Sequence, residues 1–331
     1  MTTKGTLLLT RSEVAALFSI QDAVAVVETV FRLHGEGKTQ TPGILGVNAR
    51  NGGFHIKAGL LDLNRPYFAC KLNANFPQNA KQFGLPLIQG VVALCDAENG
   101  YPLALMDSIE ITVLRTGAAT AVAAKYLARP DSKSILICGC GNQGAVSLRA
   151  IAGLFPLNRA LAYDIDHARA VQFARELGDE LQIEVKAVST VEEGLSEADI
   201  CVTCTPSKRF YVTRESVRPG TFLAAVGADS EDKQELEPTL LAGNKIVVDI
   251  LEQCVTIGEL HHGLKQNVVT TGAVHAELGE VVAGIKPGRV SSEEIIIFDS
   301  TGMALQDVVS AAAVYEKAIA AGTGTFVHLA E

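Results

Sequence analysis

A glycine-rich turn is the part of the sequence with the clearest chemical meaning. It reads Gly139-Cys140-Gly141-Asn142-Gln143-Gly144, follows the apolar run Ser134–Cys138 and opens a segment with helical periodicity. Glycine at the first position permits a tight turn, and glycine at the second lets a diphosphate approach the backbone. Glycine at the third allows close packing on the sheet, and the helix start presents N–H groups to the phosphates. In this context the motif predicts a dinucleotide-binding site.

An acidic residue at a fixed distance from this turn indicates which dinucleotide binds. The next apolar run, Ala160–Tyr163, is followed by Asp164, which lies 20 residues after Gly144. A carboxylate at that spacing hydrogen-bonds the ribose 2′-hydroxyl and repels a 2′-phosphate. The nearest arginine, Arg169, comes five residues later in a predicted helix. We therefore predict NAD as the cofactor, with NADH preferred over NADPH.

Three charged residues in apolar surroundings could act on a small molecule. Lys71 lies in the apolar run Tyr67–Asn73, where an unpaired ammonium is costly, so it either points to solvent or lines a polar pocket. Arg115 lies in a largely uncharged helical stretch, where its guanidinium suits either a carboxylate ligand or a buried ion pair. Asp229 follows the run Thr221–Val226, at the strand end where ligands bind in open parallel sheets, or it caps a helix.

The elements that must position these residues form two groups. Between Ile44 and Met106 short β runs dominate, and Asn99-Gly100 is a hairpin signal that indicates antiparallel pairing. After Ser108 apolar runs alternate with helical segments, which is typical of a parallel sheet covered on both faces. The predicted strands of the first group are Gly53–Lys57, Tyr67–Asn73, Leu87–Cys95 and Pro102–Met106. Those of the second group are Ser134–Cys138, Ala160–Tyr163, Ile183–Val188, Ile200–Thr205, Thr221–Val226 and Lys245–Ile250.

The second group contains six predicted strands, which is the number in a Rossmann domain. We therefore predict an α/β protein in which a doubly wound parallel sheet is joined to an N-terminal α+β domain. A last helix, from about residue 302 to 321, is expected to return to the N-terminal domain. The predicted domains are 1–118 together with 303–331, for substrate binding and dimerisation, and 119–302, for NAD binding.

Composition excludes several other classes of function. The 28 Lys and Arg against 37 Asp and Glu give a net charge of −9, which disfavours nucleic acids and anionic membranes as partners. No stretch of about 18 apolar residues predicts a membrane span, and no signal peptide is expected. The odd number of cysteines, seven, argues against a disulfide framework and for the cytoplasm. Cys201 and Cys204 would face opposite sides of a strand, so no metal site is predicted.

Three further stretches carry a family resemblance. They are Leu114–Ala128, Ala225-Val226-Gly227-Ala228-Asp229 with Lys233-Gln234-Glu235-Leu236, and Phe298-Asp299-Ser300-Thr301-Gly302. Together with the glycine-rich turn they resemble the ornithine cyclodeaminase/mu-crystallin family over nearly the whole chain. The resemblance implies a Rossmann domain, a second domain built from both chain ends that pairs two copies, and a homodimer. The predicted antiparallel strands also favour a homodimer, because the edge strands of such a sheet need to be covered.

The resemblance also implies roles for residues at matching positions. Lys71 matches the active-site lysine of the family, Arg115 its carboxylate-binding arginine and Asp229 its catalytic aspartate. The implied reaction is NAD(H)-dependent oxidoreduction at the Cα–N bond of a small L-amino acid or its imine. We include in the predicted cofactor set Gly139, Gly141, Asn142, Gln143, Gly144, Asp164, Thr205 and Ser300.

Two departures from the family pattern bear on the substrate. The family commonly has a second carboxylate-binding arginine after the first long helix, but Thr41–Leu45 contains none, and Lys57 is the candidate replacement cation. Cyclodeaminases of the family carry a glutamate near the position where this chain has His55. The lack of that glutamate argues against a diamino-acid substrate. The alternatives are an ammonia lyase of the ornithine cyclodeaminase type that uses bound NAD catalytically, and a crystallin-like binding protein.

Overall fold

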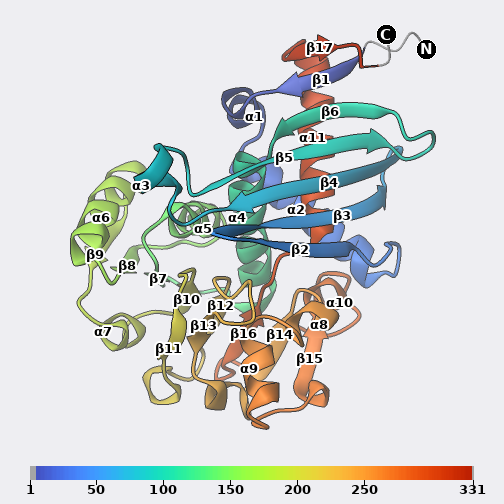
Figure 1. Cartoon of the computed structure of the whole chain (residues 1–331). Coiled ribbons are helices and arrows are strands. Elements are labelled where there is room, and N and C mark those ends of the chain that lie inside the picture. Colours follow the sequence, from blue (N-terminus) through green and yellow to red (C-terminus); the bar gives the residue numbers. More distant parts are fainter. Residues whose placement is uncertain (1–4, 330–331) are drawn as a thin grey trace. The chain divides into compact units, whose positions relative to one another are not determined.

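The computed structural model describes residues 5–329 of the chain (Figure 1). It contains two compact units. Of the described residues, the first comprises 5–30, 37–115 and 303–329, and the second comprises Phe31–Glu36 and Thr116–Gly302. The predicted first domain, 1–118 with 303–331, includes residues 1–4 and 330–331, which lie outside the described part. The observed units divide after Arg115 instead of after residue 118, and residues 31–36 belong to the second unit. The predicted domain bounds therefore stay a prediction.

The first unit is built on a seven-stranded sheet with the strand order β17-β1-β6-β5-β4-β3-β2. Its pairs are antiparallel apart from β1 with β6, and β5 and β6 form the hairpin predicted at Asn99-Gly100, where Gly100 has a φ of +77°. The sequence prediction omitted the short strands β1 and β17, and also β2. The strands are β1 Thr6–Leu9, β2 Gly43–Ala49, β3 Gly52–Asp62, β4 Pro66–Asn75, β5 Ile88–Asp96, β6 Pro102–Asp107 and β17 Thr325–Val327.

The last helix, α11 (Ala304–Ala321), belongs to the first unit, as predicted, and covers one face of its sheet. Figure 1 shows α11 running across β3 to β6, and it contacts all four strands. Gly59 allows the close approach, because a Cβ there would lie 2.8 Å from Leu305 Cδ2. Since side chains alternate along a strand, Tyr67, Ala69 and Lys71 point to the covered face of β4 and are buried. The other helices that begin in this unit are α1 Arg11–Leu17, α2 Ile20–Gly35, α3 Asn79–Phe83 and α4 Ser108–Leu127, of which α2 and α4 continue into the second unit.

The second unit is built on an all-parallel sheet with the strand order β15-β14-β16-β12-β10-β7-β8-β9. This confirms the predicted Rossmann-type sheet, but the sheet has eight strands instead of six. The apolar residues Ile296–Asp299, which precede the last helix, form an additional strand, β16, between β12 and β14, and β15 extends the edge of the sheet. The strands are β7 Ser134–Cys138, β8 Arg159–Tyr163, β9 Glu184–Ala187, β10 Ile200–Thr203, β12 Phe222–Ala225, β14 Lys245–Val248, β15 Val274–Glu277 and β16 Ile296–Asp299.

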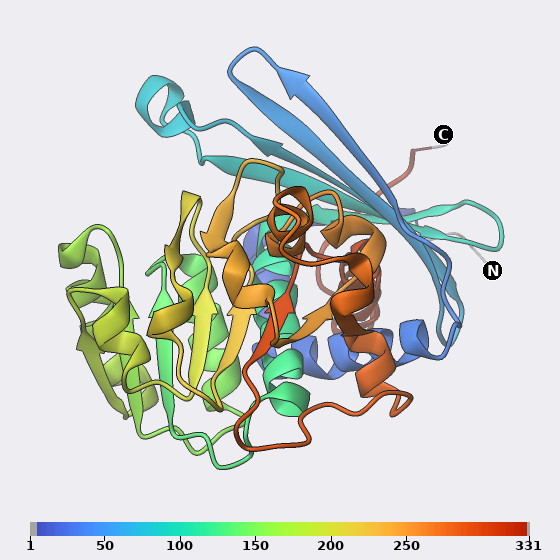
Figure 2. The same cartoon turned by 90° about the horizontal axis from the view of Figure 1, so that it is seen from below.

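Helices cover both faces of this parallel sheet (Figure 2). A Cβ on Gly144 of α5 would meet Ile137, whereas one on Gly194 of α7 would meet Leu136. Consecutive strand residues point to opposite faces, so α5 and α7 lie on opposite faces. A small parallel pair, β11 (Lys208–Val212) with β13 (Gln234–Leu236), adds to the unit. The remaining elements are α5 Asn142–Ala152, α6 His167–Leu181, α7 Val191–Leu195, α8 Leu251–Cys254, α9 Glu259–Lys265, α10 Leu278–Val282, η1 Arg214–Ser216, η2 Pro238–Leu241 and η3 Thr271–Ala273.

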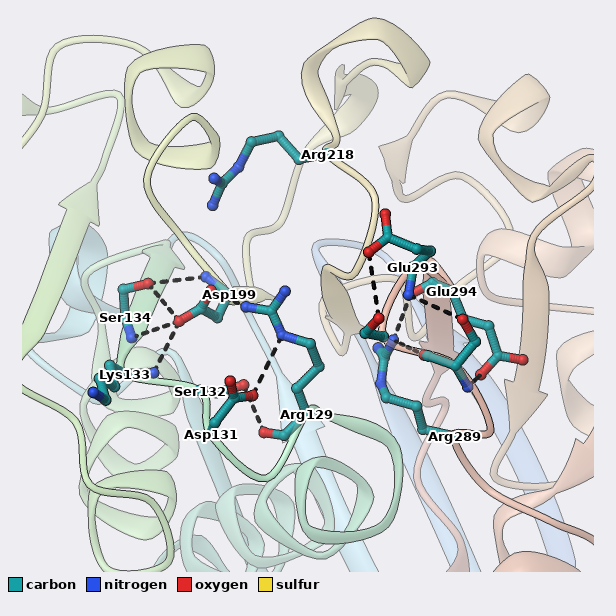
Figure 3. A network of polar contacts seen from close by, with 12 residues as sticks. Arg129, Asp131, Ser132, Lys133, Ser134, Asp199, Arg218, Arg289, Glu293 and Glu294 are labelled. Carbon is teal, nitrogen blue, oxygen red and sulfur yellow. Dashed lines mark hydrogen bonds and ion pairs between the residues drawn. The ribbon is translucent and has the colours of Figure 1, made fainter.

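Polar contacts tie the segments at the amino ends of these strands (Figure 3). Arg129 Nη2 lies 2.5 Å from Asp199 Oδ1, and Asp199 Oδ2 accepts hydrogen bonds from the N–H groups of Lys133 and Ser134. Arg289 donates to the carbonyl of Glu294. A polar hollow of about 660 Å³ also lies at this end, beside Lys245 and Glu294. Ligands of open parallel sheets bind at the opposite, carboxyl end, so we assign these contacts to the stability of the fold.

Among the described residues, no single helix is long and apolar enough to cross a membrane. The neighbouring helices α1 and α2 reach the required length and apolar content only as a pair bent by 80°, which is weak evidence for a span. The seven cysteines are free, and Cys201, within β10, is buried.

Candidate active site and nucleotide site

A cluster of charged side chains lies on the helix-covered face of the first unit. Lys71 on β4, Arg115 on α4 and Asp307 on α11 are all at least nine-tenths buried. Lys71 Nζ lies 2.7 Å from Asp307 Oδ2, and Arg115 Nε lies 3.1 Å from Asp307 Oδ1. Arg115 Nη1 also donates to Gln306 Oε1 at 3.0 Å. The structure therefore brings together two of the predicted residues, through an aspartate and a glutamine that the sequence analysis missed.

Lys57 extends the positive charge of this cluster. It lies on β3 directly opposite Lys71 in the strand register. The pKa of Lys71 is lowered to about 7, mainly by burial. The charge of Asp307 opposes this effect, and the charges of Arg115 and Lys57 add to it. Burial alone would raise the pKa of Asp307, but Lys71 and Arg115 outweigh it, so that pKa is lowered. Three cations thus act on one buried carboxylate.

His55 lies on the same face of β3 as Lys57, two residues away along the strand. It pairs in register with Asn73 of β4, whose Oδ1 accepts a hydrogen bond from Ser108 Oγ at 2.6 Å. His55 is exposed. His55 and Asn73 therefore lie next to the cationic cluster in the strand register, and neither of them carries a carboxylate.

The glycine-rich turn of the second unit has the backbone geometry that the motif predicts. Gly139 has a φ of +105°, which favours glycine, and a Cβ on Gly144 would lie 2.2 Å from the Gly139 carbonyl oxygen. A Cβ on Gly141 would meet no atom within 4 Å, so a side chain there would fill the space before α5. Helix α5 begins at Asn142, with Gln143 in its first turn, and no side chain caps it. Its first N–H groups are arranged to receive phosphate oxygens.

Asp164 is held beside this turn. Its Oδ2 accepts a hydrogen bond from Cys140 N at 2.9 Å, and its Oδ1 accepts one from Asp166 N at 3.0 Å. The carboxylate therefore has a fixed orientation next to the glycine-rich turn, at the end of β8.

The remaining predicted residues of the second unit lie at the carboxyl ends of other strands. Thr205 follows β10 and bonds to the buried Glu235. Ser300 follows β16 and donates from Oγ to Asp249 Oδ2 at 3.2 Å. Asp229 follows β12, and its carboxylate is 61% exposed and lies 2.5 Å from Lys233 Nζ. Glu235 and Asp249 carried no signal in the sequence beyond their place in apolar or motif stretches.

Comparison with known proteins places these features in a family. The model of the ornithine cyclodeaminase/mu-crystallin family matches residues 4–322. The alanine dehydrogenase of Archaeoglobus fulgidus is 40% identical over 97% of this chain and 97% of its own length. A solved archaeal alanine dehydrogenase dimer with bound NAD superposes with a TM-score of 0.94, at 39% identity, over 98% of this chain and 99% of its own. The Δ1-pyrroline-2-carboxylate reductase of Thermococcus litoralis, solved with NADH and L-proline, gives a TM-score of 0.92 at 36% identity, over 97% of this chain and 100% of its own. The chain belongs to the ornithine cyclodeaminase/mu-crystallin family.

Proposed function

We propose that this protein is an NAD(H)-dependent oxidoreductase that acts on the Cα–N bond of a small L-amino acid or its imine. The observation that carries the proposal is the pair of buried cations, Lys71 and Arg115, which share the carboxylate of Asp307. Buried charge without compensation is costly, so such a cluster favours a ligand that brings a carboxylate. Gln306 supports this, because its buried Nε2 has no hydrogen-bond partner among residues 5–329.

NAD fits the glycine-rich turn and its surroundings. Gly139, Gly141 and Gly144 allow the backbone to approach a diphosphate, and Asn142 and Gln143 start the helix that faces it. Asp164 would accept from the ribose hydroxyls, while Thr205 and Ser300 line the neighbouring strand ends. Bound NAD would supply hydride chemistry, and the protein would supply orientation and charge.

The charged residues would have separate roles toward the substrate. Arg115 and Lys57 would hold the carboxylate, and Lys71 would polarise the imine or the amine. Lys57 suits the role of the missing arginine because it pairs in register with Ile44, in the segment where the family carries that residue. Asp229 would accept or donate the proton, and its exposed carboxylate can exchange protons with water.

The similar proteins agree with this reaction class. An alanine dehydrogenase and a reductase of a cyclic imino acid are among them. With His55 where a diamino-acid enzyme would need a carboxylate, these similarities favour the oxidoreductase over the cyclodeaminase and crystallin-like alternatives.

We also propose that the protein forms a homodimer through the open face of the first unit's sheet. Apolar side chains on six neighbouring strands point to this face and are 36–56% exposed. Contiguous exposed apolar surface of this extent marks an interaction site. The residues are Leu8, Leu105, Val91, Phe68, Leu72, Phe54, Leu45 and Val47. A similar protein is a dimer in its solved structure, which supports a second copy as the partner.

The experiment that tests the activity is a panel of 2-oxo acids with ammonia or methylamine, together with pre-formed cyclic imino acids. NADH absorbance is followed at neutral pH. We expect oxidation of NADH with at least one small imino acid, and none with the same compounds lacking a carboxylate. A failure of every imino acid would contradict the proposal.

A further inference from the structure

Glu235 is a buried carboxylate that accepts hydrogen bonds only from uncharged donors. It lies on β13 and is 0% exposed. Its Oε1 accepts from Thr205 N at 2.7 Å, from Thr205 Oγ1 at 2.7 Å and from the Tyr211 hydroxyl at 2.8 Å. Its Oε2 accepts from Thr203 Oγ1 at 2.7 Å and from Gly227 N at 3.0 Å. Within residues 5–329 no lysine or arginine forms an ion pair with it.

These donors favour the ionised form of Glu235. A backbone N–H can only donate, and one such group points at each oxygen, from Thr205 and from Gly227. An ionised carboxylate only accepts, so it can receive all five hydrogen bonds at once. A protonated one would lose one of them, because its O–H would have to donate to a hydroxyl that now donates to it. Burial raises the pKa of Glu235, and the hydrogen bonds from Thr205 and Thr203 act against that effect. The second unit thus holds a fixed negative charge without a counterion.

The charge lies on one particular side of the nucleotide turn. In the strand order β8-β7-β10-β12, Asp164 follows β8, while Thr203 ends β10 and Gly227 follows β12. The turn itself touches the β10 side, because a Cβ on Gly139 would lie 3.0 Å from Thr205 Cγ2. A dinucleotide binds across the point where the strand order reverses, with one ribose at the acid after the second strand. Its nicotinamide half is therefore expected on the side of β10 and β12, where Glu235 lies.

We propose that the charge of Glu235 biases the nucleotide site toward the oxidised cofactor, whose nicotinamide ring carries a positive charge that the reduced ring lacks. This inference rests on the proposed function. Hydride transfer from NADH to an imine carbon, with one proton added to nitrogen, yields the amine and NAD⁺. A fixed negative charge beside the ring stabilises the product side of that transfer. We assign Glu235 no contact with the reacting atoms, so it acts as a positioning and charge-tuning residue.

Replacing the charge with a neutral amide tests the proposal by binding alone. In Glu235→Gln, the amide nitrogen can take the place of Oε2, because the Thr203 hydroxyl can rotate to accept from it, and only the Gly227 N–H bond is lost. Dissociation constants of NAD⁺ and NADH are measured without substrate, by calorimetry and by NADH fluorescence. We expect the preference for NAD⁺ over NADH to fall by roughly tenfold, mainly through weaker NAD⁺ binding.

Tyr211→Phe is the matched control. It removes one donor to Glu235 and keeps the charge, so both dissociation constants should change by the same factor. Equal weakening of NAD⁺ and NADH in Glu235→Gln would overturn the proposal and leave a purely structural role. Failure of the unaltered protein to bind either nucleotide would be a different result, since it would overturn the proposed function itself.

A measurement on the unaltered protein covers the case in which Glu235→Gln does not fold. Benzamide adenine dinucleotide has the shape of NAD⁺ but lacks the ring charge. We expect NAD⁺ to bind roughly tenfold more tightly than this neutral analogue. Equal affinity for the two would overturn the role of Glu235.

Discussion

Lys71 and Asp307 form a buried ion pair between the sheet and the last helix of the first unit. Lys71 Nζ lies 2.7 Å from Oδ2 and 2.9 Å from Oδ1, and both side chains are less than 5% exposed. Asp307 also binds Arg115, so one carboxylate orients the two cations that we assign to the substrate. The pair joins residues 236 positions apart and anchors α11 to β4.

Removing the shared carboxylate should strongly destabilise the protein. Asp307→Asn leaves Lys71 and Arg115 buried without their anion, and breaking a buried pair in this way costs about 3–5 kcal/mol. The free energy of unfolding in urea is the measurement. Glu180→Gln is the control, because it breaks the exposed pair with Arg149 and should cost at most about 1 kcal/mol. Similar losses in both variants would show that the buried pair has no special role.

The pH dependence of imine reduction should report on Lys71. A protonated Lys71 is needed to polarise the substrate, and its pKa in the free protein is about 7. The value of kcat/KM, which follows the free enzyme, should therefore fall as the pH rises through about 7. The limb in kcat should lie at higher pH, because a bound carboxylate favours the charged amine. Lys71→Arg, which stays charged, should lose the limb in kcat/KM; an unchanged profile in that variant would assign the titration to another group.

Cofactor preference should depend on Asp164. The unaltered protein should use NADH more efficiently than NADPH, because the carboxylate repels a 2′-phosphate. Asp164→Ala should reduce this preference, as measured by the ratio of kcat/KM for the two cofactors. Asp166→Ala removes the neighbouring carboxylate, which caps α6, and should leave the ratio unchanged. Equal use of both cofactors by the unaltered protein would contradict the role of Asp164.

Charges on the open sheet face should separate the homodimer. Leu72 and Val91 are directly paired across β4 and β5, and both point to that face. The double variant Leu72→Lys with Val91→Lys should give a monomeric mass by light scattering at micromolar concentration, where the unaltered protein gives a dimeric one. Ile285→Lys, at a site in the second unit that is 59% exposed, should not alter the mass. A monomeric unaltered protein would refute the proposal.

The local signals in the sequence predicted most of the second unit and part of the first. The glycine-rich turn, Asp164 and the alternating runs are local patterns, so they could be read directly. The roles of Gln306 and Asp307 could not be predicted, because they depend on the packing of their helix against β4. The same holds for Glu235, whose donors come from β10, β11 and the segment after β12. The order of the parallel strands could not be predicted from the sequence either, because tertiary packing alone places β16 between β12 and β14.

The most direct test of the assigned reaction is the stoichiometry between the NADH consumed and the amino acid formed. With the best imino acid from the panel, the absorbance loss of NADH and the amount of amino acid formed are measured in the same sample. We expect one NADH to be consumed for each amino acid formed, and the reverse reaction should reduce one NAD⁺ for each amino acid oxidised. Product formed from a diamino acid with only catalytic NAD and no net change in absorbance would contradict it and identify a cyclodeaminase.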